Sequence, residues 1–178
     1  MLELLVTMAV ASILLAIAVP ALSMFIQNNR EDAEADALIS SLDYARSEAV
    51  KRNVDIQVCA SDTGAACSGA TAWNGGWIVA TTDPTPIVLQ VKDPLGGGNT
   101  LSGTLGLGGT AISEVTFEPN GFDKDGIANQ YATTYFTLCD SRGATDARDI
   151  EISPVGAIQA SPTPGQTLDD PPNPLTCP

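Results

Sequence analysis

The sequence contains no histidine and only eight lysines and arginines, against 21 aspartates and glutamates. Without histidine a Ser-His-Asp triad is excluded, and no Ser–Lys or paired-carboxylate pattern takes its place. We therefore expect neither an enzyme nor a bound cofactor. The formal net charge of −13 opposes binding to nucleic acid phosphates and anionic lipid surfaces. No basic cluster offsets that charge, since the densest group is only Arg46, Lys51 and Arg52.

The N-terminus also lacks positive charge, because no Lys or Arg precedes Arg30. A secretory signal peptide has a basic start, an apolar run of roughly 7–15 residues and a cleavage site of small residues. Here the apolar run, Leu4–Ile26, holds 23 residues, and no clear cleavage site follows it. As a helix it would be about 35 Å long, enough to cross a bilayer. A plain membrane anchor would explain this length, but not Glu3 before the run or Pro20 within it.

Residues 31–52 continue the helix with a different pattern. Apolar residues recur at three- and four-residue steps, while charges fill the other faces. The recurring residues are Ala35, Leu38, Ile39, Leu42, Ala45 and Ala49. We predict one helix from Glu3 to about Arg52, kinked or locally melted at Pro20, because proline removes a backbone donor and clashes with the preceding turn. Its first half should lie in a membrane or filament core, and its second half under a sheet.

The rest of the chain predicts an antiparallel sheet. Alternating or β-branched runs indicate strands at 54–58, 77–80, 87–91, 115–117, 135–139 and 149–152, and the glycine-rich loop holds one more at 104–107. The fold class is α+β, a long N-terminal helix packed on an antiparallel β-sheet domain. We divide the chain into a transmembrane or filament-core half-helix (1–26), an amphipathic half-helix (27–53), a β-rich domain (54–161) and a proline-rich tail (162–178).

Four cysteines outside the apolar segment suggest disulfides and an oxidising compartment. Three pairings are open, and the simplest joins Cys59 to Cys67 and Cys139 to Cys177. A metal site is the alternative, but the spacing of Cys59 and Cys67 does not suit zinc and there is no histidine. The loop Asp123–Gly126 opens like a calcium site, although the remaining ligands of an EF-hand are missing. We therefore predict no metal site.

The first residues, MLELLVTMAVASILLAIAVPAL, resemble the mature N-terminus of type IV pilins and type II secretion pseudopilins. In that family the mature chain opens with an aromatic residue or Met, followed by T-L-x-E-L-L. The family's glutamate matches Glu3, and its helix-kinking proline matches Pro20. The family's leader and first mature residues have no counterpart here, so Met1 falls where the family has Leu. Either the true start lies upstream of Met1 or the chain has been trimmed.

Later pieces resemble the minor pilin and pseudopilin group called GspH or FimT/FimU. They lie at 45–53, 55–59, 73–77, 88–91, 117–121, 136–140 and 148–153. The resemblance covers most of Glu3 to Gly156. It implies a minor subunit near the tip of a pilus or pseudopilus, with an inner-membrane helix and a periplasmic domain. The implied partners are other major and minor subunits, the inner membrane, and prepilin peptidase for the precursor.

The resemblance gives Glu3 a role in assembly, where it would meet the N-terminal amine of a neighbouring subunit. The alternative is an interfacial acid favoured by the helix dipole. Three functions remain: a minor pilin that initiates or caps a type IV pilus, a GspH-type pseudopilin of a type II secretion system, and a DNA-binding competence pilin. The last is disfavoured, because its G-R-x-R motif falls at Gly156-Ala157-Ile158-Gln159, where both arginines are absent.

Overall fold

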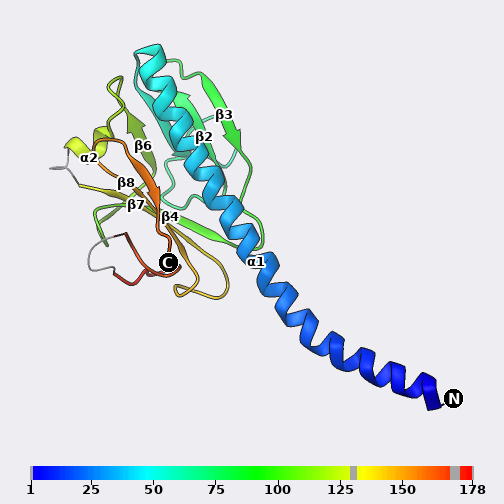
Figure 1. The fold of residues 1–178 in the computed structure, drawn as a ribbon. Helices are drawn as coiled ribbons and strands as arrows, with labels where there is room; N and C mark the ends of the chain where they lie inside the picture. The colour runs from blue at the N-terminus through cyan, green and yellow to red at the C-terminus, as the bar shows by residue number, and fades with distance from the viewer. Residues whose placement is uncertain (1, 129–131, 169–172, 178) are drawn as a thin grey trace.

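The computed structural model describes residues 2–128, 132–168 and 173–177. Helix α1, Leu2–Arg52, runs along one side of the β-rich domain and extends far beyond it (Figure 1). The residue after its end, Asn53, has a φ of 56°, the left-handed conformation that commonly follows a helix C-terminus. Lys51 and Arg52 in the last turn stabilise the helix, because their positive charges interact favourably with the negative end of the helix dipole. The predicted single helix to about Arg52 is therefore confirmed.

The helix continues through Pro20 without interruption. Local melting, one of the two outcomes expected at this proline, therefore does not occur. Figure 1 shows the helix axis curving in the part that extends from the domain. A helix can remain continuous through a proline by bending there, because the proline removes only one backbone donor.

The rest of the described domain contains two antiparallel sheets. Both lack the parallel crossovers of a βαβ fold, which confirms the predicted α+β class. The first sheet has the order β3 (Val88–Lys92), β2 (Trp77–Thr81), β1 (Ile56–Ala60), β6 (Glu114–Phe117). The second has the order β5 (Thr110–Ile112), β4 (Thr100–Leu105), β7 (Thr134–Cys139), β8 (Arg148–Ile152), β9 (Ile158–Ala160).

Several strand boundaries differ from the sequence prediction. Strand β1 begins two residues later than expected, and β4 covers 100–105 rather than 104–107. Three elements were not predicted: the short strands β5 and β9 and the helix α2, Lys124–Ala128. Each of these elements has five residues or fewer, so its own sequence gives little periodicity.

The core lies between the second half of α1 and the two sheets. The apolar stripe predicted on the helix faces inward, with Leu38, Leu42, Ala45 and Ala49 all fully buried. Trp73, in the loop before β2, is fully buried and packs against the second sheet. Its indole N–H donates to the carbonyl of Ile112 at 3.0 Å, and its ring meets that of Phe136 edge-on at 4.9 Å.

Candidate assembly surface

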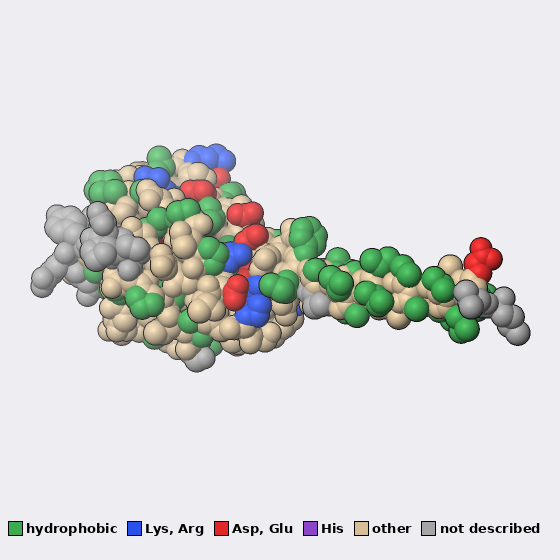
Figure 2. All heavy atoms as spheres, turned by 60° about the horizontal axis from the view of Figure 1, so that its bottom comes forward, with side chains coloured by type: hydrophobic (Ala, Val, Ile, Leu, Met, Phe, Trp, Pro, Cys, Tyr) green, Lys and Arg blue, Asp and Glu red, His purple; other side chains and the backbone are tan. Residues whose placement is uncertain are grey.

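The first half of α1 is an apolar surface that nothing in the described structure covers. Its large hydrophobic side chains are about half to two-thirds exposed, from Leu4 at 61% to Ile26 at 48%. Figure 2 shows this part as a rod of hydrophobic side chains leaving the domain. It belongs to the one described helix that is long and apolar enough to cross a membrane. Apolar surface on this scale marks a membrane or protein contact.

Glu3 lies in the first turn of α1, at the far end of this rod from the domain. Its side chain is exposed. No partner for this carboxylate is present within the described part of the chain. The charge is therefore available to a group outside the subunit. The structure describes the backbone of Pro20, which lies within the same rod.

A cluster of charged and polar residues holds the domain to α1 where the rod begins. We call it the junction cluster: Asn28, Glu31 and Asp32 from α1, and Asp140, Arg142, Asp146 and Arg148 from β8 and the loop before it. Arg142 donates from Nη2 to Glu31 Oε2 at 2.8 Å and from Nη1 to Asn28 Oδ1 at 2.6 Å. Arg148 Nε donates to Asp32 Oδ1 at 2.8 Å. The loop between β7 and β8 is thereby tied to the helix.

Glu31 is fully buried at the centre of the junction cluster. Burial, helped by the nearby Asp140 charge, raises the pKa of Glu31 to about 7, although Arg148 and Arg142 act in the opposite direction. Its Oε1 oxygen has no hydrogen-bond partner among the described residues. Sequence reasoning missed this group. The available signal was that Glu31 occupies the same helix stripe as Ala35, Leu38 and Leu42.

A second buried carboxylate, Glu34, holds the glycine-rich loop against α1. Its two oxygens accept hydrogen bonds from the backbone N–H of Gly96 at 2.8 Å and the side chain of Asn99 at 2.7 Å. Gly97 has a φ of 67°, and a Cβ there would overlap the Arg30 guanidinium. The positive φ favours glycine here, whereas the end of the flexible Arg30 side chain can move aside. The loop has a structural role beside the helix.

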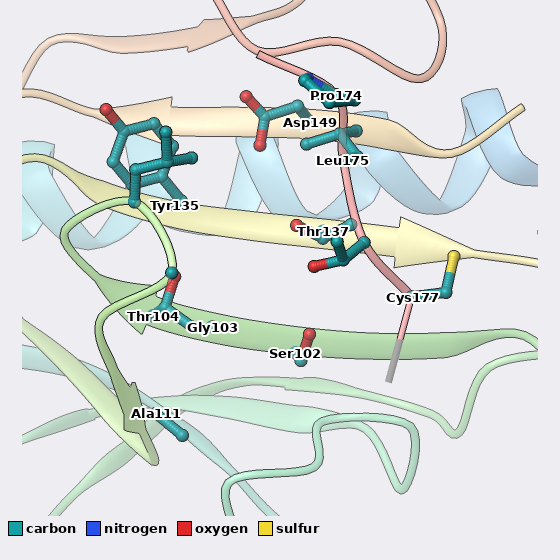
Figure 3. A pocket seen from close by; sticks show the side chains of 13 residues that line it. Ser102, Gly103, Thr104, Ala111, Tyr135, Thr137, Asp149, Pro174, Leu175 and Cys177 are labelled. Carbon is teal, nitrogen blue, oxygen red and sulfur yellow. The ribbon is translucent and has the colours of Figure 1, made fainter. Parts of the chain in front are cut away.

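The cysteines are joined as Cys59–Cys67 and Cys139–Cys177. The second bond anchors the C-terminal tail, which Figure 3 shows crossing the outer face of β7 and β8. Leu175 is buried against this face, above a hollow of about 280 Å³ lined by residues of β4, β7 and the tail. Among the residues described, the tail forms neither a helix nor a named strand, in keeping with its prolines.

The stretch Asp123–Gly126 forms the start of helix α2, with Asp123 as its cap. The Asp123 carboxylate accepts a hydrogen bond from the backbone N–H of Asp125 at 3.1 Å and from the Thr134 hydroxyl at 2.8 Å. Asp123 directly precedes α2, so its side chain occupies the N-cap position. Burial raises the pKa of this carboxyl, and the hydrogen bond from Thr134 offsets part of that effect. The carboxylate oxygens that could have bound calcium thus satisfy protein donors.

Together, an exposed membrane-length half-helix, its continuation as the core helix of an antiparallel domain, and a single acid at the outer end define a membrane-anchored pilin-like subunit. Residues 34–156 match the family described as type II transport protein GspH, and the chain belongs to that family. The predicted family is therefore confirmed. No curated protein sequence shows significant similarity to the chain.

Solved structures show the same fold. The type IV minor pilin FimU of Pseudomonas aeruginosa, in one crystal form, is 25% identical with a TM-score of 0.61, and the match covers 78% of this chain and 92% of FimU. The minor pseudopilin EpsH of the Vibrio cholerae type 2 secretion system is 12% identical with a TM-score of 0.51, over 74% of this chain and 96% of EpsH. At 12% identity the second likeness concerns the fold alone.

Proposed function

We propose that this chain is a minor pilin that assembles through its apolar half-helix into a type IV pilus and helps to initiate or cap the fibre. The observation that carries this is the uncovered apolar rod ending in Glu3. Hydrocarbon covers such a rod before assembly, and the helices of neighbouring subunits cover it afterwards. The single-pass helix then lies in the inner membrane with the domain in the periplasm, where the two disulfides are stable.

Glu3 provides register during this assembly. A carboxylate within an apolar helix bundle is costly unless it is paired, so an incoming subunit is held where its N-terminal amine meets Glu3. Pro20 would let the helix bend as subunits pack. Prepilin peptidase would process the precursor, as the family resemblance implies. The partners are therefore the major and minor subunits of the same fibre, and the acidic domain gives DNA no attractive surface.

The second candidate is a minor pseudopilin of a type II secretion system, and the GspH family match favours it equally. The two are separated by deleting the gene. Loss of surface pili with normal protein export supports the pilin, and loss of export with normal pili supports the pseudopilin. A competence receptor would require the domain from Gln27 onward to retard duplex DNA at physiological salt. We expect no retardation.

The assembly role is tested with Glu3→Gln and Glu3→Ala in the full chain. Both variants should insert in the membrane at wild-type levels, because hydrophobic burial of the rod is unchanged, yet be depleted in sheared fibres. Asp43→Asn, an exposed acid on the same helix, is the matched control and should be recovered normally. Wild-type recovery of both Glu3 variants in fibres would contradict the proposed role.

A further inference from the structure

A groove lies between α1 and the free edge of the second sheet, close to the start of the rod. Its volume is about 450 Å³. Its apolar lining comes from Ala35 and Ile39 of α1 and from Ala160, Pro162 and Pro164 of β9 and the tail. Figure 1 shows the short β9, in orange, beside the helix. We propose that this groove receives an extended segment of a neighbouring pilin-like subunit that carries a lysine or arginine. The inference rests on the proposed function.

The charge of the groove selects a basic occupant. The charged side chains of its lining on the α1 side of the sheet are two carboxylates, Asp32 and Asp36, and one guanidinium, Arg148. Asp32 is already bonded to Arg148 at 2.8 Å. Asp36, one turn further along the helix, is exposed and forms no ion pair with the described residues. A lysine or arginine placed over Asp36 would complete the charge balance, whereas an acidic segment would be repelled.

The edge of β9 selects an extended segment. Two backbone hydrogen bonds flank β9, from Ser161 N to Asp149 O and from Ser153 N to Ala157 O, both 2.9 Å. They determine which residues of β9 direct their backbone N–H and C=O groups toward β8. Because antiparallel pairing alternates, the polar backbone groups of Gln159 face β8 and those of Ile158 and Ala160 point away from it. Within the part of the chain that the structure describes, β9 is the edge strand, so these groups are open to another strand. Ala160 also lines the groove.

The position of the groove selects a neighbouring subunit as the source of that segment. Asp32 lies six residues after Ile26, which is about 9 Å along a helix. Any subunit packed against the end of the rod therefore lies within reach of the groove. The contact would be continuous with the surface that the proposed assembly buries.

The test places the photo-cross-linking residue benzoylphenylalanine at Ala160 in the full chain, expressed in cells that assemble the fibre. We expect a cross-link to a segment of a neighbouring subunit with a lysine or arginine nearby. Asp36→Lys should lower the cross-link yield by about tenfold or more, because like charges meet at the contact. Asp43→Lys carries the same charge change on the same helix outside the groove and should stay within about twofold of the wild type.

Four outcomes would overturn the inference. They are equal yields from Asp36→Lys and Asp43→Lys, a cross-link only to lipid, a cross-link only to a protein without a pilin-like helix, and no cross-link from a chain that is recovered in fibres. The last leaves the proposed function intact. Absence of the wild-type chain from both pili and pseudopili would instead overturn the proposed function, and this inference with it.

Discussion

Removing the Cys139–Cys177 disulfide should destabilise the domain more than removing Cys59–Cys67. The two bonds close sequence separations of 38 and 8 residues. In the chain-entropy model these loops contribute about 4 and about 2.5 kcal/mol to the free energy of unfolding. The larger loss should therefore come from Cys139→Ala with Cys177→Ala. Alanine is preferred to serine, because Cys59 and Cys139 are buried and a serine hydroxyl there would need a partner.

The tail should also loosen locally when its bond is removed. Its remaining contacts include hydrogen bonds from Gly165 N to Ala147 O at 2.9 Å and from Leu168 N to Glu151 Oε1 at 2.6 Å, together with burial of Leu175. A segment with this many prolines and few large apolar side chains has little else to oppose its chain entropy. Limited proteolysis should therefore cut the tail of the variant before the domain unfolds.

The assay is urea unfolding of the domain from Gln27 onward, followed by fluorescence of the buried Trp73 and Trp77. The buried core begins at Glu31, so this fragment contains all of it. Non-reducing peptide mapping should first recover each cysteine pair in one cross-linked peptide. A map joining Cys59 to Cys139 would refute the pairing. Equal losses of stability in the two double variants would refute the loop-length argument.

Two further predictions concern the core and the junction cluster. Trp73→Ala should lower the free energy of unfolding by about 4 kcal/mol in the same urea assay, because it removes a fully buried indole packed against the second sheet. A loss no larger than that of an exposed substitution such as Ser47→Ala would contradict this. For Glu31, the folded pKa of about 7 lies above the value of 4.5 in the unfolded chain, so the unfolded state releases its proton first. As the pH rises from 4.5 to 7, the free energy of unfolding should therefore fall by up to about 3 kcal/mol. Urea titrations of the Glu31→Gln variant over the same pH range should not show this decrease.

Local sequence patterns predicted those elements whose own residues have a clear hydrophobic periodicity or a long apolar run. The 23 uncharged residues of Leu4–Ile26 and the stripe from Ala35 to Ala49 both favour a helix from the local pattern alone, and the structure contains that helix. The strands β2 and β7 were likewise predicted nearly in place, because their apolar runs are long enough to recognise. The Cys139–Cys177 pair could be proposed from sequence only as the simplest of three pairings.

The missed features depend on contacts between distant residues. Strand β9 has three residues and exists through its pairing with β8, while α2 depends on the Asp123 cap and on Thr134 eleven residues later. The sequence Asp123–Gly126 suits a calcium loop and a helix cap alike, and the hydrogen bond from Thr134 distinguishes them. Arg142 meets Glu31 across 111 residues of sequence, and no spacing rule identifies such a pair.

The two halves of α1 differ in burial: the first half is exposed and the second half packs against the sheets. The junction cluster lies at the boundary between them. Before Asn28 the helix presents apolar side chains to its surroundings, and after it the apolar stripe is covered by the protein's own sheets. Arg142 binds both Asn28 and Glu31, so the domain is fixed to the helix directly beside the rod. A buried charge pair is a weak source of net stability, because desolvation opposes its attraction. Its orientation, however, is specific. The cluster is therefore best understood as fixing the direction in which the rod leaves the domain, which an assembling subunit must present correctly to its neighbours.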